Sequence, residues 1–177
     1  MKLNKLAMAL GFGLVMAAGA ASAAVSDQGH GSVTIKGSII DAPCSITPET
    51  IDQTVDLGQI SNKQLQDSGK SSPKSFAIKL ENCDLAAGDN TAQITFTGMA
   101  SKGNPALIGM TGSAEGASIG LTNGAGELIT MGQPTDIDLA NGNNTLSFSA
   151  YLQGDGASAT IVPGSFQSVV DFNLVYP

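Results

Sequence analysis

The chain has 177 residues, of which only 13% are charged and 5% are aromatic, while glycine contributes 22. This length predicts one domain, and the 42% hydrophobic content is enough for an ordinary core, which excludes wholesale disorder. The net charge of −7 argues against nucleic acids and anionic membranes as partners, because both require a basic patch. The 8 basic residues are all lysines, and one histidine and two cysteines leave few side chains for metal or nucleophile chemistry.

The N-terminus has the three parts of a secretory signal peptide. Lys2 and Lys5 form a short basic start, residues 6–21 are apolar or small, and small residues end at Ala23, where a signal peptidase would cleave. The apolar stretch is shorter than the roughly 20 residues that span a bilayer, which disfavours a membrane anchor. We therefore expect residues 1–23 to be a cleaved signal peptide and the remaining chain to be exported.

Cys44 and Cys83 are the only two cysteines. Export exposes them to an oxidising compartment, which favours one disulfide between them over two free thiols or a metal pair. A zinc site needs four ligands, and two cysteines with one distant histidine make a poor set. The chain-entropy treatment predicts that such a bond stabilises the fold by about 4 kcal/mol.

The exported chain opens with a short alternating segment. Residues 24–31 are weakly patterned and have little to bury, so we expect them to be mobile on their own. The residues that follow place one set of side chains on one face, namely Val33, Ile35, Gly37 and Ile39, and a polar set on the other, namely Ser32, Thr34, Lys36 and Ser38. This alternation predicts a half-buried strand.

The rest of the chain predicts short strands separated by turns. Apolar residues favour strands within 51–60, 76–83, 94–98, 119–121, 137–139 and 146–152. Residues 61–74 and 101–116 are polar or glycine-rich and irregular, with room for a turn or two of helix at 62–67. Asn-Gly sequences predict turns at 122–126 and 141–144. The last run is the most regular, with Phe166, Ser168, Val170, Phe172, Leu174 and Tyr176 on one face. Many short strands without a linker or a repeat indicate a single all-β sandwich.

Few side chains could carry catalysis. Asp136 and Asp138 share a strand face, but two carboxylates fall short of the six to eight oxygens that Ca²⁺ requires, so we expect them to be solvated. His30 lies in the weakly patterned segment with no nucleophile fixed beside it. The sequence has no Gly-x-Ser-x-Gly elbow and no phosphate-loop lysine. We therefore predict no enzymatic activity, no metal and no cofactor.

Five segments, taken together and in this order, carry a family resemblance. They are Gly31-Ser32-Val33-Thr34-Ile35-Lys36-Gly37-Ser38-Ile39-Ile40, Asp41-Ala42-Pro43-Cys44-Ser45-Ile46, Asp52-Gln53-Thr54-Val55-Asp56-Leu57-Gly58, Leu80-Glu81-Asn82-Cys83-Asp84, and Gly164 through Tyr176. The chain resembles a subunit of the chaperone–usher pili of Gram-negative bacteria, close to the major rod subunits of P and type 1 pili. The resemblance covers essentially the whole chain after the signal peptide.

The resemblance implies an incomplete immunoglobulin-like sandwich that lacks its last strand. Such a fold leaves an open groove with exposed core and unpaired backbone groups at the sheet edges. Another chain can fill the groove by adding a strand, which is β-augmentation. The family's scheme is that a periplasmic chaperone lends a strand first, and the N-terminal arm of a neighbouring subunit then replaces it.

Residue roles follow from this resemblance. Residues 24–40 would be the donor-strand arm leading into the first strand, and residues 41–177 the pilin domain. The arm side chains that enter the neighbour's groove would be Val33, Ile35 and Ile39, with Gly37 at the position of the family's arm glycine. The strand that lines the groove and that the chaperone grips would contain Gly164, Phe166, Val170, Phe172, Leu174 and Tyr176. The carboxylate of Pro177 would anchor to basic residues of the chaperone.

The implied function is a structural subunit of a cell-surface fimbria that supports adhesion. Its partners would be identical or related subunits, a periplasmic chaperone and an outer-membrane usher, with no nucleic acid and with any host receptor left unnamed. A minor adaptor or terminator subunit of the same family is the alternative. A tip adhesin is disfavoured, because tip adhesins of this family carry an extra lectin domain and lack the donor arm.

Overall fold

The computed structural model describes residues 29–88 and 90–177. The predicted signal peptide and the first five residues of the predicted arm lie outside the described residues. The chain divides into two units, of which the second is Ile40–Pro177. The described part of the first unit, residues 29–39, contains no helix or strand.

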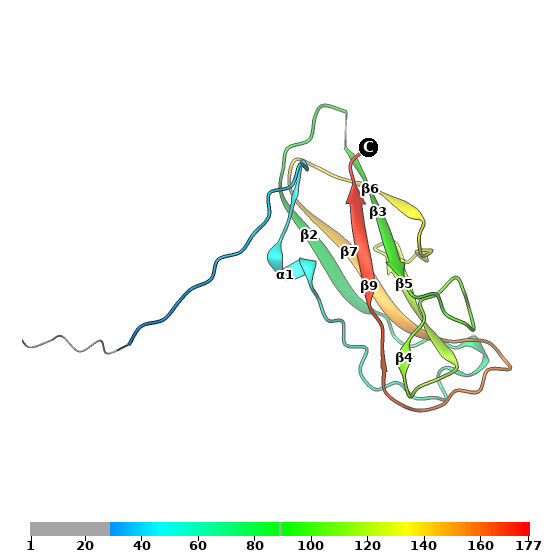
Figure 1. The fold of residues 1–177 in the computed structure, drawn as a ribbon. Coiled ribbons are helices and arrows are strands. Elements are labelled where there is room, and N and C mark those ends of the chain that lie inside the picture. The colour runs from blue at the N-terminus through cyan, green and yellow to red at the C-terminus, as the bar shows by residue number, and fades with distance from the viewer. Residues whose placement is uncertain (1–28, 89) are drawn as a thin grey trace, which may run out of the picture. The chain divides into compact units, whose positions relative to one another are not determined.

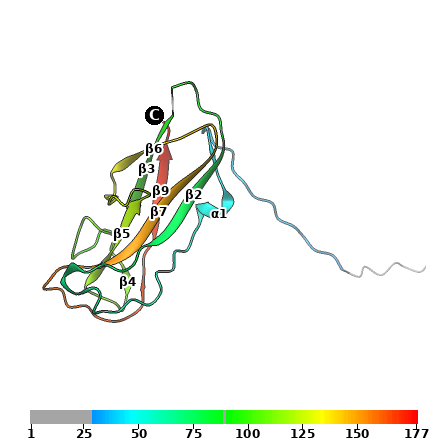
Figure 2. The same ribbon diagram turned by 180° about the vertical axis from the view of Figure 1, so that it is seen from behind.

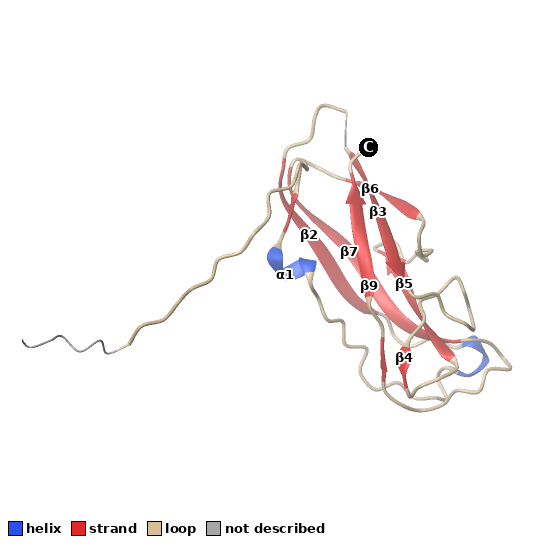
Figure 3. Cartoon of the chain, in the orientation of Figure 1, coloured by secondary structure: helices blue, strands red, loops and turns tan. Residues whose placement is uncertain are grey.

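The second unit is built almost entirely of strands, as Figure 3 shows in red. In chain order the elements are β1 (Ser45–Ile46), α1 (Pro48–Ile51), the 3₁₀ turn η1 (Gln66–Ser68), β2 (Lys74–Cys83), β3 (Thr91–Gly98), β4 (Thr111–Gly112), β5 (Ala117–Asn123), β6 (Pro134–Asp138), β7 (Gly142–Gly154), β8 (Phe166–Gln167) and β9 (Val170–Val175). The predicted strands at 76–83, 94–98, 119–121, 137–139 and 146–152 are each found. The predicted turn of helix at 62–67 is found as the turns leading into η1.

Two main sheets pack face to face. One has the strand order β1-β2-β7-β5 and the other β6-β3-β9, with every pairing antiparallel. Figure 1 shows β9 and β3 toward the viewer, and Figure 2, from behind, shows β2 and β7 in front. Core side chains between the sheets include the fully buried Ile78 and Ile94. Phe96 and Phe148 meet edge to face across the core with ring centroids 5.1 Å apart. The predicted all-β sandwich is confirmed.

The predicted disulfide is present. Cys44 and Cys83 are bonded and buried, and the bond ties the segment before β1 to the end of β2. The backbone N–H of Asp84 donates to the carbonyl of Pro43 at 2.9 Å, which holds the same two segments together. The bond therefore closes one end of the sandwich.

Removing this bond should destabilise the fold. The cysteines are 39 residues apart, so the bond restricts a long loop in the unfolded chain, and the double variant Cys44→Ser/Cys83→Ser should lose about 2–4 kcal/mol of unfolding free energy. Urea unfolding of the exported chain measures the loss. Reduced and alkylated wild-type protein is the matched control and should unfold at the same urea concentration as the variant. An unchanged midpoint in both would contradict a stabilising role for the bond.

One of the two predicted turns differs in the structure. The predicted turn after β5 is found. The chain reverses there, and the N–H of Ile129 donates to the carbonyl of Leu121 at 2.9 Å. The turn predicted at 141–144 is wrong, because β6 and β7 belong to different sheets and Gly142, with φ of 94°, already begins β7. The chain crosses the sandwich there instead of forming a hairpin, which lets the apolar residues on both sides reach the one core.

The regular C-terminal run is interrupted. It forms β8 and β9 with a break at Ser168 and Val169, where the Ser168 hydroxyl donates to the carbonyl of Gly109 at 2.8 Å. The partner also changes, since β8 pairs with β4 and β9 with β3. The alternation continues through the break, so the sequence pattern cannot reveal it.

Candidate functional site, an open groove at the sheet edges

A groove with a volume of about 1270 Å³ opens along one side of the sandwich. Its floor is made of core side chains from both sheets, namely Ile46, Phe76, Ile78, Phe96, Ile119, Leu121 and Ala150. One side is residues 51–58 and the other is residues 164–172, which include β8 and the first half of β9. The groove thus gives direct access to the hydrophobic core.

The first side of the groove is an extended segment without a partner strand. The strand predicted within 51–60 is wrong, because α1 ends at Ile51 and residues 53–60 join no sheet. The segment still alternates like a strand, with Val55 and Leu57 half-buried against the core and Asp56 exposed. What it lacks is a hydrogen-bonded neighbour, because the groove lies where that neighbour would be. In Figure 1 it descends from α1 in cyan and teal.

The second side of the groove is an unpaired sheet edge. The order β6-β3-β9 makes β9 the last strand of its sheet, hydrogen-bonded to β3 along one edge only. Val170 and Phe172 are half-buried in the groove lining, whereas Val169 is 68% exposed. An open strand edge beside exposed core is a template for pairing with another chain.

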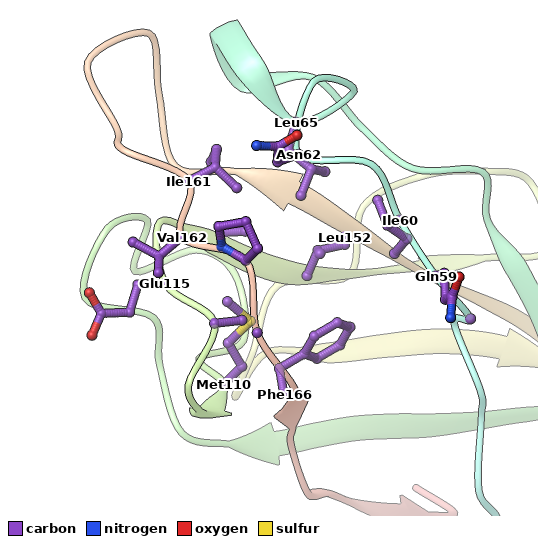
Figure 4. A pocket seen from close by; sticks show the side chains of 15 residues that line it. Gln59, Ile60, Asn62, Leu65, Met110, Glu115, Leu152, Ile161, Val162 and Phe166 are labelled. Atoms are coloured by element: carbon purple, nitrogen blue, oxygen red, sulfur yellow. The ribbon is translucent and has the colours of Figure 1, made fainter.

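A smaller pocket of about 310 Å³ continues the groove past the start of β8. It shares Gly58, Gly164 and Phe166 with the groove. Figure 4 shows Met110, Leu152 and the ring of Phe166 around the same space. The smaller pocket therefore adds apolar side chains such as Met110 and Leu152 to the end of the groove.

Only the first part of the C-terminal strand that the resemblance assigned to the groove lies along it. Its first four predicted residues line the groove, namely Gly164, Phe166, Val170 and Phe172. Leu174 and Tyr176 are half-buried against the core, where burial raises the pKa of the Tyr176 hydroxyl above its ordinary value, and Pro177 is exposed. A Cβ at Gly164 would lie 2.6 Å from the backbone N of Ala114, so this close approach requires glycine.

The predicted arm residues are not in a strand. Val33, Ile35 and Ile39 are 88%, 91% and 104% exposed, so the half-buried strand predicted from their alternation is wrong for the single chain. A strand needs a hydrogen-bonded neighbour, and these residues have none among the described strands. A Cβ at Gly37 would meet no atom within 4 Å and its φ is not positive, so the described chain itself does not require glycine there.

The two aspartates that share a strand face in the sequence do not form a metal site in the described residues. Asp136 and Asp138 are both exposed on β6, and the side-chain amide of Gln93 donates to Asp136 at 2.9 Å. Among residues 29–88 and 90–177, no group of three or more His, Cys, Asp or Glu gathers as metal ligands. Nor does this part of the chain contain a helix long and apolar enough to cross a membrane.

Sequence reasoning identified one side of the groove and missed the other. The floor residues and the segment 52–58 were not predicted as site residues. The resemblance predicted that one strand is missing, but the alternation of the half-buried Val55 and Leu57 does not show that their segment borders the gap. The sheet order and the groove lining place residues 52–58 there.

Comparisons with known proteins point to one family. The profile described as Fimbrial protein matches residues 33–177. The "Fimbria A protein" of Serratia marcescens is 56% identical over 179 residues, which cover 99% of each chain. A solved chaperone–usher pilus, reported in connection with rod uncoiling, has a subunit of 32% identity and TM-score 0.75, covering 85% of this chain and 97% of that one. The P pilus rod subunit PapA has 31% identity and TM-score 0.68, covering 77% of this chain and all of the other. The chain therefore belongs to the fimbrial protein family and is an immunoglobulin-like structural subunit of a bacterial cell-surface fimbria.

Proposed function

We propose that residues 29–40 of one copy fill the groove of the next copy as an added strand, and that this exchange builds the fimbria. The observation that supports the proposal is that one chain contains both a groove that lacks a strand and a segment that lacks a sheet to join. The groove exposes core and an unpaired edge of β9, and the arm carries exposed apolar side chains at every second residue. Each part supplies what the other lacks.

The dimensions of the two parts agree. A strand rises about 3.3 Å per residue, so residues 31–40 would span about 33 Å. The groove side that includes β8 and the first half of β9 runs from Gly164 to Phe172, which is a similar number of residues. An arm in this position would place Val33, Ile35 and Ile39 on the apolar floor and donate backbone hydrogen bonds to β9.

Export creates a need for a temporary partner. A chain released into the periplasm with this groove open would expose a large apolar surface, which favours aggregation. A periplasmic chaperone that lends a strand to the same groove would cover it, with the exposed carboxylate of Pro177 as an anchor for chaperone cations. An outer-membrane usher would then direct the exchange of the lent strand for the arm of the next subunit.

The role within the fimbria is that of a rod subunit. A subunit that carries both an arm and a groove can join copies of itself end to end, which a repeated rod requires. The similarity to a P pilus rod subunit supports this role over that of a minor adaptor or terminator. The floor of the groove is apolar and suits the binding of a strand, which supports a structural role and not an enzymatic one.

A charge placed in the apolar face of the arm tests the proposal. We expect wild-type copies to form denaturation-resistant multimers in unheated gel samples, and Ile35→Asp should abolish them because it would bury an unpaired carboxylate in the groove. Ser32→Asp makes the same kind of change on the opposite face, four residues and about 13 Å along the strand from Lys36, and should keep most multimers. The comparison uses the full chain in cells that express the chaperone and usher. Equal ladders from the two variants would mean that the arm does not insert with the proposed face inward.

A further inference from the structure

The groove has a charge pattern that its apolar floor does not explain. Three carboxylates line it, from Asp52 and Asp56 on one side and from Asp171 on the other, and no lysine is among the lining residues. All three aspartates are exposed. Asp56 is also held in place, because the backbone N–H of Gly58 donates to its Oδ1 at 2.8 Å.

Two of these aspartates, Asp56 and Asp171, lie on the outward faces of their segments. Asp171 stands between the half-buried Val170 and Phe172, and Asp56 stands between the half-buried Val55 and Leu57. Successive side chains of an extended segment point to opposite faces, so each aspartate points away from the core that its two neighbours contact. A strand added between the two sides would therefore bring its own outward residues next to these carboxylates.

The arm carries one charge on that outward face. Within residues 31–40, Lys36 is the only charged side chain, and it lies in the polar set opposite Val33, Ile35 and Ile39. With those apolar residues on the groove floor, Lys36 faces outward between the two sides. Directly opposed side chains on adjacent strands have Cβ atoms about 5 Å apart, and diagonal ones about 7–8 Å, both within reach of a lysine.

We propose that Lys36 of one copy pairs with Asp171 and Asp56 on the two sides of the groove in the next copy, and that this pairing sets the register of the added strand. The inference rests on the proposed strand exchange. A strand with apolar residues at every second position can slip by two residues and still bury an apolar face. Such a slip moves Lys36 by about 6.6 Å along the groove, away from its partners, and brings a neutral Ser or Thr in its place.

Charge exchange in the full chain tests this pairing. Because every copy carries both arm and groove, Lys36→Glu and Asp171→Lys should each lower the multimer fraction about two- to fivefold, the scale set by exposed ion pairs. The double variant Lys36→Glu/Asp171→Lys restores opposite charges and should recover to within about twofold of wild type. Lys74→Glu, at an exposed position outside the groove lining, changes the net charge equally and should have no effect.

Two further measurements separate the possible failures. The first is the amount of disulfide-bonded monomer, which reports folding. If Asp171→Lys reduces that amount, the double variant Lys36→Glu/Asp171→Asn is used instead, and it should recover part of the multimer fraction. A Lys36→Glu chain that assembles like wild type, or double variants no better than the worse single variant, would overturn the pairing. Ile35→Asp is run in parallel: if it blocks assembly while Lys36→Glu does not, only this inference fails, and if neither blocks assembly, the proposed exchange itself fails.

Discussion

A chain that carries a second copy of residues 29–40 after Pro177 should be several kcal/mol more stable to urea than the unmodified exported chain. The added segment would occupy the groove of its own molecule and bury Val33, Ile35 and Ile39 on a floor that is otherwise open to water. Burial of each large aliphatic side chain contributes roughly 1.5–3 kcal/mol, and ordering the segment offsets part of this. Equilibrium unfolding in urea, with the midpoint and slope both fitted, measures the gain.

A flexible linker joins Pro177 to the added copy, and its length reports the direction of the added strand. With a linker of about four residues, the chain can only reverse direction just after β9, so the added strand would run antiparallel to β9. A parallel strand must start at the far end of the groove, about 30 Å away, which needs a linker of ten or more residues. The control fusion carries serine at the three apolar positions of the added copy. If the fusion unfolds at the same urea concentration as this control, the groove does not accept the arm.

Gly37→Val should reduce denaturation-resistant multimers at least about tenfold while the yield of disulfide-bonded monomer stays unchanged. Valine favours strands more than glycine does, so strand propensity alone predicts a benefit. Within the described chain a Cβ at Gly37 meets nothing, so folding of the monomer gives no reason for the glycine. Glycine in a strand is typical of close approach by another backbone, which here would come from the neighbouring subunit.

Ser38→Val is the matched control, because it adds similar bulk to the next residue on the outward face. This variant should keep a normal ladder of multimers in unheated gel samples. If Gly37→Val lowers the monomer yield as well, the glycine serves the fold of its own subunit. A normal ladder from Gly37→Val would remove the residue from the interface and would require a different register for the arm.

The sequence by itself determined the parts of this protein that depend on local patterns. Alternation around Ile78, Ile94 and Phe148 identified core strands, because the period of two is a property of the strand itself. The disulfide between Cys44 and Cys83 followed from there being only two cysteines in an exported chain. The resemblance, carried by short segments spread along the chain, led to the family that the comparisons confirm.

Only the tertiary structure decided which strands have neighbours. Val33, Ile35 and Ile39 alternate with polar residues, and Val55 and Leu57 do so within 51–60, yet neither segment is a strand in the single chain. The run from Phe166 to Tyr176 is one pattern in the sequence, but it changes partner between β8 and β9. The physical reason is that alternation records which face of a segment is apolar, whereas a strand exists only where a second backbone completes its hydrogen bonds.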